Sequence, residues 1–210
     1  MNRDCTKLYL LRHGETEKYN GEFVFSGHVD LNLTKKGEEQ LALQGKRLRD
    51  RPIKMVYSSD LQRSYKGAQA IADALSVGVI QDSRVKEICS GRWDGLTYSQ
   101  VADNYPDECK LRYMDLVNYR IEGGGENLLD ARERAMAAVF DIVEKHRGEE
   151  VALVAHGGIN RIILSEALGL DLKNILRLEQ DFGCLNIIEF NADAALVRLI
   201  NLKPQENDIV

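Results

Sequence analysis

Long apolar runs are missing from this sequence of 210 residues. No stretch approaches the ~20 consecutive apolar residues that a membrane-spanning helix needs. The first residues, "MNRDCTK", are charged and are not followed by the apolar region of a secretory signal. We therefore expect a cytoplasmic protein that has no membrane partner.

Cysteine is scarce and scattered. The chain has four, Cys5, Cys89, Cys109 and Cys184, and no two of them have the C-x-x-C spacing. Zinc sites and disulfide frameworks rely on closely spaced or regularly repeated cysteines. We expect four reduced thiols that fill space, and neither a metal site nor a disulfide.

A surplus of basic residues is also absent. Lysine and arginine number 28 against 33 aspartates and glutamates, which gives a formal net charge of -5. No basic stripe with interleaved aromatic residues occurs, so nucleic acid is not an expected partner. Any anion that this protein binds must be held by a local cluster of arginine and histidine, against the overall charge.

What the chain does have is a regular alternation of short and long apolar patterns, in a composition that is 44% hydrophobic. The patterns predict strands over 7–11, 53–57, 77–80, 151–155, 184–190 and 195–201, and helices over 34–50, 60–75, 126–147 and 158–168. Thr34 and Asp60 are expected to cap the first two helices. Such an alternation predicts an α/β fold, a three-layer sandwich with a mostly parallel central sheet flanked by helices. The last two strands should form an antiparallel hairpin at an edge.

One segment differs from the rest of what is otherwise expected to be a single domain over 1–210. Residues of about 88–125 are rich in tyrosine and charge, and they run into the turn "EGGGEN". This composition predicts an irregular insertion that caps a site.

Polar side chains follow two of the predicted strands where each strand ends. Arg12 and His13 follow "LYLL", and His156 follows "VALVA", each histidine leading into glycine. Ligands of open parallel sheets lie outside the carboxyl ends of the strands, so these side chains should meet. Arg63, on the first turn of the helix after the strand at 53–57, is placed to reach the same edge.

Each of these residues also has a structural reading. A single histidine at a strand end is more often a hydrogen-bonded structural residue than a catalyst. Arg12 alone could pair with Glu15, and Arg63 alone could belong to a solvated helix face. The combination at one sheet edge favours a functional site. His28, in a loop, and His146, at a charged helix end, are left outside it.

Five segments, in this order, carry a family resemblance: "LRHGET", "GHVDLNLTKKGEEQ", "YSSDLQRS", "EICSGRWDGLT" and "VAHGG". They resemble the successive signatures of the histidine phosphatase superfamily, in the branch that includes cofactor-dependent phosphoglycerate mutases. The resemblance implies a phosphoglycerate mutase-like sandwich, a phosphohistidine intermediate, and no metal or other cofactor. It also implies that His13 is the nucleophile, that Arg12, Arg63 and His156 form the phosphate pocket, and that Glu87 is the proton donor.

These implied roles make chemical sense. The neutral imidazole of His13 has a lone pair suited to attack on phosphorus. Arg12 and Arg63 carry planar forks that match phosphate oxygens, and a protonated His156 would add a donor. Glu87, as a partly desolvated carboxyl group facing an anion, would hold its proton near neutrality and release it to the leaving alkoxide.

A phosphate contact by Asn20 is a further expectation. Many members of the family have asparagine seven positions after the motif arginine, where this chain has Tyr19. A one-residue insertion in this loop would let Asn20 take that role.

The substrate is expected to be a small phosphorylated metabolite. The insertion at 88–125 is shorter than that typical of the mutases, which favours a phosphatase. "FSGH" and "DFGCLNIIEF" resemble the α-ribazole-5′-phosphate phosphatases of cobalamin nucleotide-loop assembly. A phosphoglycerate mutase, a broad-specificity sugar phosphatase and a non-catalytic regulatory protein that binds phosphorylated ligands remain alternatives, although binding alone would require neither His13 nor Glu87. The oligomeric state stays open, a homodimer included.

Overall fold

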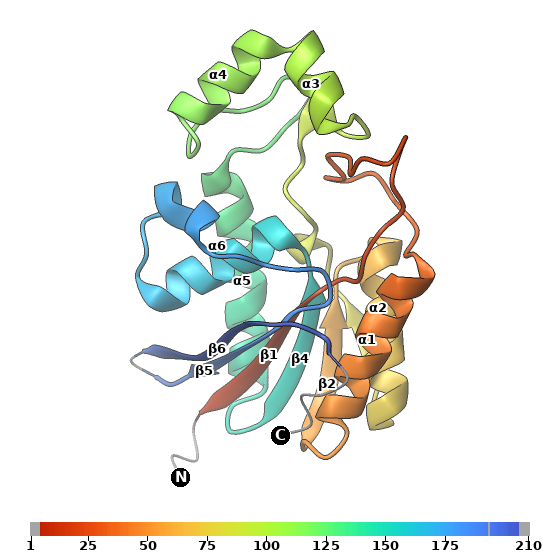
Figure 1. Cartoon of the computed structure of the whole chain (residues 1–210). Coiled ribbons are helices and arrows are strands. Elements are labelled where there is room, and N and C mark those ends of the chain that lie inside the picture. Colours follow the sequence, from red (N-terminus) through yellow and green to blue (C-terminus); the bar gives the residue numbers. More distant parts are fainter. Residues whose placement is uncertain (1–4, 193, 206–210) are drawn as a thin grey trace.

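A six-stranded sheet with helices on both faces forms the body of the molecule, and a helical cap covers one end (Figure 1). The computed structural model describes residues 5–192 and 194–205. The strands are β1 (Thr6–Arg12), β2 (Ile53–Ser58), β3 (Val79–Gln81), β4 (Glu150–Ala155), β5 (Leu185–Phe190) and β6 (Ala195–Leu202). The α-helices are α1 (Lys35–Leu48), α2 (Gln62–Leu75), α3 (Tyr98–Asn104), α4 (Pro106–Met114), α5 (Leu128–Lys145) and α6 (Gly157–Leu168). Three 3₁₀ helices complete the list: η1 (Ser83–Val85), η2 (Gly91–Trp93) and η3 (Leu172–Arg177).

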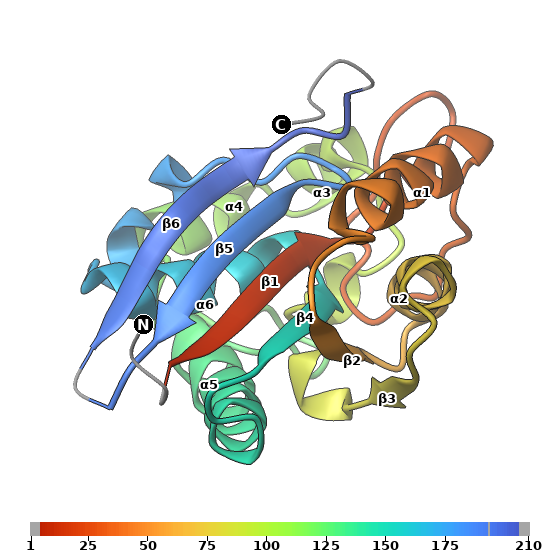
Figure 2. The ribbon, with the colours of Figure 1, turned by 90° about the horizontal axis from the view of Figure 1, so that it is seen from below.

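The strand order is β3-β2-β4-β1-β5-β6, which Figure 2 shows from below. The first four strands in this order run parallel, β5 lies antiparallel to β1, and β6 lies antiparallel to β5. The predicted mostly parallel sheet with a hairpin at one edge is therefore confirmed. Since β2, β4 and β1 are parallel neighbours, their carboxyl ends open at the same edge.

The sheet is buried on both faces, as its strand sequences require. Along β1, Leu8 and Leu10 belong to the apolar core shared with α5 and α6, whereas Tyr9 and Leu11 belong to the core shared with α1 and α2. Successive side chains of a strand point to opposite faces, so one apolar run serves both cores. This arrangement is the predicted three-layer sandwich.

Local sequence signals predict the cap of α1 correctly and the cap of α2 incorrectly. Thr34 caps α1, because its side chain accepts a hydrogen bond from the backbone N–H of Gly37. The predicted cap Asp60 is wrong: α2 begins at Gln62, whose N–H donates to Asp30 Oδ1 at 2.8 Å. The capping group comes from a loop 32 residues earlier in the chain, which no local pattern reveals.

The cap is more regular than the predicted irregular insertion. It contains η2, α3 and α4, and a small apolar core of Trp93, Val101 and Ile121. Thr97 and Gln100 form a reciprocal capping box at the start of α3, and Pro106 occupies the first turn of α4. These helices are short, so their apolar periodicity is too brief to be recognised in the sequence.

All four cysteines are free, as expected, and only Cys184 is fully buried. Over residues 5–192 and 194–205, no cluster of three or more histidine, cysteine, aspartate or glutamate side chains is arranged to hold a metal ion. None of the helices in these ranges is both long and apolar enough to cross a membrane.

Candidate active site

The predicted cluster forms where β1, β2 and β4 end. Arg12 closes β1 and is followed by His13, while His156 directly follows β4. The imidazole rings of the two histidines lie with their centroids 5.2 Å apart. Arg63, on the first turn of α2, is fully buried and close enough to affect the charge state of both rings. The structure therefore brings all four residues together.

His13 has the geometry of a nucleophile. Its Nδ1 lies 2.8 Å from the carbonyl oxygen of Gly14, and because a carbonyl only accepts, Nδ1 carries the proton. The lone pair therefore resides on Nε2. Burial, together with the Arg12 and Arg63 guanidiniums, lowers the pKa of His13 well below its usual value of 6.5. His13 is a neutral imidazole with a defined tautomer.

Gly14 permits this placement. A Cβ at Gly14 would lie 2.1 Å from the carbonyl oxygen of Gly37, at the start of α1. Only glycine allows the chain to turn this closely against the helix directly after His13. The "HG" pair seen in the sequence therefore has a steric cause here.

Three buried nitrogen atoms near this position have no hydrogen-bond partner among the described residues. They are Arg12 Nε, Arg63 Nε and His156 Nδ1. Neither arginine forms an ion pair with a described residue, and burial lowers the pKa of both guanidiniums. Burying hydrogen-bond donors and cations without partners costs free energy, so this site is suited to bind an anion.

The rest of each guanidinium is anchored to the protein. Arg63 donates through its two Nη atoms to the carbonyl oxygens of Val29 and Gly27, at 2.6 and 2.7 Å. Arg12 donates through Nη1 to the Gln180 carbonyl at 2.6 Å, and its guanidinium carbon lies 3.8 Å from the centre of the Phe182 ring. A guanidinium carries five N–H groups, so these bonds anchor each arginine and still leave donors on both, among them the unpartnered Nε–H of each.

The surroundings of His156 favour its neutral form, so the further donor that a protonated imidazole would add is not favoured here. Burial, followed by the charges of Arg63, His13 and Arg12, lowers the pKa of His156 well below its usual value. Its Nε2 lies 2.6 Å from the hydroxyl oxygen of Ser59, a fully buried residue that the sequence analysis did not single out.

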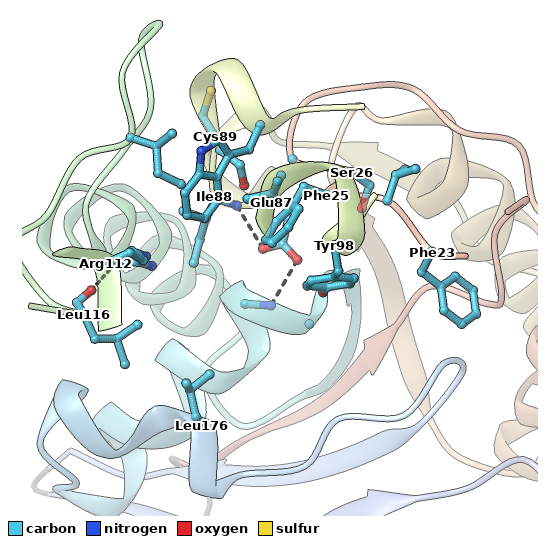
Figure 3. A pocket seen from close by; sticks show the side chains of 18 of the residues that line it. Phe23, Phe25, Ser26, Glu87, Ile88, Cys89, Tyr98, Arg112, Leu116 and Leu176 are labelled. Carbon is cyan, nitrogen blue, oxygen red and sulfur yellow. Dashed lines mark hydrogen bonds between the residues drawn. The ribbon is translucent and has the colours of Figure 1, made fainter. Parts of the chain in front are cut away.

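Glu87 lies close enough to Arg12 and Arg63 to affect the charge state of both guanidiniums, and Figure 3 shows it among the side chains that line a pocket. Its carboxylate accepts the backbone N–H of Ile88 at 2.9 Å and that of Gly158, in the first turn of α6, at 3.0 Å. A Cβ at Gly158 would lie 2.6 Å from Glu87 Oε1, so glycine is required for this contact. The backbone carbonyl of Glu87 accepts hydrogen bonds from Arg134, which the sequence analysis did not single out, and from His28, which it left outside the site.

Two further residues that the sequence analysis discussed, His146 and Asn20, lie outside the buried cluster. His146 lies outside the site, as expected, and its ring contacts Tyr57 and Glu149. Asn20 does not join the buried cluster. It lies exposed in a two-residue turn with Gly21, and both residues have positive φ, 49° and 82°. An Asn-Gly pair is a signal for this kind of hairpin turn, and here it accounts for the asparagine.

A large cavity opens between this edge and the cap. Its volume is about 1010 Å³, far more than a phosphoryl group needs. Arg12, Glu87 and Gly158 line it together with apolar and aromatic side chains from the cap, from the loops before it and from η3, among them Phe25, Ile88, Trp93, Tyr98, Leu116 and Leu176. Figure 3 shows Glu87 surrounded by several of these side chains. The cavity can hold an organic group joined to a phosphate at its base.

The buried neutral histidines predict a loss of stability in acid. Below pH 6.5 the unfolded chain protonates His13 and His156, whereas the folded chain does not until its lowered pKa values are reached. The free energy of unfolding should fall by about 1.4 kcal/mol from each histidine between about pH 7.5 and 5.5. Urea unfolding at both pH values measures this, and His13→Gln should show the smaller fall. An equal fall in both proteins would contradict it.

We compared the chain with known protein families, proteins and solved structures. The model of the histidine phosphatase superfamily (branch 1) matches residues 8–203. Phosphoglycerate mutase-like protein 4 of Arabidopsis thaliana is 34% identical over 166 residues, covering 78% of this chain and 72% of that protein. Phosphoserine phosphatase 1 of Hydrogenobacter thermophilus is 31% identical over 180 residues, covering 86% and 82%.

A solved structure of a putative α-ribazole-5′-P phosphatase from Escherichia coli is also similar. It matches with a TM-score of 0.85 and 21% identity, over 94% of this chain and 96% of that one. A likeness at this identity concerns the fold alone.

Proposed function

Because the chain belongs to branch 1 of the histidine phosphatase superfamily, we propose that it hydrolyses phosphomonoesters without a metal ion, through a phosphohistidine on His13. Phosphoric monoester hydrolysis is consistent with the phosphatases among its relatives. One observation carries the mechanism. A neutral His13, with its lone pair on Nε2, lies near two buried N–H donors that lack partners, Arg12 Nε and Arg63 Nε, and near the unpartnered Nδ1 of His156.

In the first step, His13 Nε2 attacks phosphorus and the bond from phosphorus to the ester oxygen breaks. The charge on the phosphoryl oxygens is stabilised by the N–H groups of Arg12, Arg63 and His156, which are in place before the reaction. The leaving alkoxide takes a proton from Glu87. The products are a phosphohistidine and a free alcohol.

In the second step, water attacks the phosphohistidine. Glu87, now a carboxylate, takes a proton from the water, and the bond from phosphorus to Nε2 breaks. Inorganic phosphate leaves and His13 returns to its neutral tautomer. The two arginines serve throughout as the positive charges that metal ions supply in other phosphoryl-transfer enzymes.

For the substrate, we propose a phosphomonoester with a bulky organic group, and α-ribazole 5′-phosphate is the specific candidate. The cavity of about 1010 Å³ above Glu87 supports this because it has room for a ribose and an aromatic base. Its aromatic lining, which includes Phe25, Trp93 and Tyr98, favours stacking on such a base. A small anionic ester such as 3-phosphoglycerate would leave most of this surface unused.

The test is phosphate release from a panel of esters in excess EDTA, with His13→Ala as the blank. The panel contains α-ribazole 5′-phosphate, 3-phosphoglycerate, phosphoserine, sugar phosphates and nucleoside monophosphates. We expect full activity in EDTA and a kcat/KM for α-ribazole 5′-phosphate ~10²-fold or more above the others, a gap of about 2.7 kcal/mol.

Other outcomes have definite meanings. Interconversion of 2- and 3-phosphoglycerate without phosphate release would make the protein a mutase. Equal rates across sugar phosphates would make it a broad-specificity phosphatase and remove α-ribazole 5′-phosphate as the preferred substrate. Tight binding of phosphorylated ligands without turnover would identify a regulatory protein. Loss of activity in EDTA, restored by a divalent ion, would overturn the metal-independent mechanism.

A further inference from the structure

Ser59 directly follows β2, is fully buried, and has its hydroxyl oxygen 2.6 Å from Nε2 of His156. We propose that Ser59 is a positioning residue that fixes the tautomer of His156, so that a neutral imidazole presents its Nδ1–H to the phosphoryl oxygens. The inference rests on the proposed function, because it assumes that the anion at His156 is the phosphoryl group of the substrate.

The position of the proton follows from what surrounds the hydroxyl of Ser59. The backbone N–H of Leu61 donates to the hydroxyl oxygen at 3.4 Å, so a lone pair of that oxygen is already occupied. Within the described part of the chain, the acceptor that the hydroxyl hydrogen can reach is Nε2 of His156. A neutral imidazole has one N–H, and if Nε2 accepts, that N–H is on Nδ1.

The opposite tautomer is unfavourable on two counts. With the proton on Nε2, the Ser59 hydroxyl hydrogen would be buried without an acceptor. Nδ1 of His156 would then carry a lone pair into the buried site that Arg12 Nε and Arg63 Nε supply with donors. A lone pair facing phosphate oxygens repels them, whereas an N–H binds them.

The contact with Ser59 lets His156 bind phosphate even though burial keeps its imidazole uncharged. The surroundings of His156 keep its imidazole neutral, so it cannot bind phosphate through a positive charge. With its tautomer fixed, it still adds a third N–H donor to those of Arg12 Nε and Arg63 Nε. These donors serve the phosphoryl oxygens, so their contribution should not depend on which alcohol leaves.

The tautomer can be observed directly by NMR. The chain has only four histidines, so ¹⁵N-histidine labelling and a long-range ¹H–¹⁵N correlation spectrum resolve them, with His156→Gln for assignment. At neutral pH, the full-length protein should show His156 protonated on Nδ1 and unprotonated on Nε2. Ser59→Ala should move the proton to Nε2 in a large fraction of molecules.

Kinetics give a second readout that a merely structural role would not produce. Ser59→Ala should lower kcat/KM by about 10- to 100-fold, and by the same factor for p-nitrophenyl phosphate and for an alkyl phosphate. Ser59→Thr keeps the hydroxyl and should restore both the tautomer and the activity. The matched control is Ser58→Ala, because Ser58 is equally buried and its hydroxyl has no hydrogen-bond partner among the described residues.

The results separate this inference from the proposed function. A wild-type spectrum with His156 protonated on Nε2 would overturn the inference even if Ser59→Ala failed to fold. So would an unchanged tautomer in a folded Ser59→Ala, or a loss of activity of equal size in Ser58→Ala. A wild-type protein that hydrolyses no ester would overturn the proposed function, and the NMR result would still stand.

Discussion

His13→Ala will release no inorganic phosphate above the uncatalysed rate, although it will fold and bind phosphate. In the proposed mechanism the variant removes the one protein atom that forms a bond to phosphorus, so we expect kcat to fall by at least ~10⁴-fold, as when other covalent nucleophiles are removed. The unpartnered Nε–H donors of Arg12 and Arg63 do not belong to His13 and remain in the variant. Binding of inorganic phosphate should therefore survive.

Phosphate binding distinguishes loss of the nucleophile from loss of the fold. It can be measured by calorimetry alongside the thermal unfolding midpoint. In the wild type, rapid acid-free quenching with a ³²P-labelled ester should trap an acid-labile phosphoprotein, which His13→Ala should not form. Wild-type turnover by His13→Ala, or a phosphoprotein that survives the substitution, would place the covalent intermediate elsewhere or remove it.

The sequence predicted well those parts of the site that follow an apolar strand directly. Arg12, His13 and His156 were found because each comes at the end of a buried run, and parallel strands bring such ends together. Arg63 was found because it lies one residue into a helix that follows a strand of the same sheet. In these four cases, local sequence and topology point to the same place.

The residues that hold the site in place were not predictable in this way. Ser59 contacts a histidine 97 residues away, Arg12 is anchored by a carbonyl 168 residues away, and Arg134 holds the backbone of Glu87 from 47 residues away. No local pattern marks such partners. Glu87 itself was identified only through the family resemblance, because a single glutamate after a short strand has no distinguishing spacing.

Local sequence signals were also misleading where one residue type suits two different structural roles. Asparagine suits a phosphate contact, and it also suits a turn with positive φ, and the structure has Asn20 in the turn. Asp60 suits a helix cap, yet it forms an ion pair with Lys86 at 2.9 Å while Asp30 takes the cap. In both cases, tertiary contacts decide between two locally reasonable roles.

Glu87→Gln should produce the second large effect, and its size should depend on the leaving group. A poor leaving group such as an alkyl alcohol needs a proton as its bond to phosphorus breaks, and Gln cannot supply one. We expect kcat/KM for alkyl phosphates to fall by about 10²- to 10⁴-fold. p-Nitrophenolate leaves without a proton, so p-nitrophenyl phosphate should lose less than about 10-fold.

The remaining contacts of Glu87 explain why the comparison between substrates is needed. Its carboxylate accepts N–H groups from Ile88 and Gly158, and a glutamine side chain can accept only one of them well. That disturbance lowers the rate for both substrates alike and cancels in their ratio. A ratio unchanged from the wild type would show that the proton comes from another group. If the ratio of the two kcat/KM values shifts ~10-fold or more towards p-nitrophenyl phosphate, Glu87 is the acid. A change in binding or in the fold would affect both substrates, whereas loss of the acid slows only the substrate whose leaving group needs a proton.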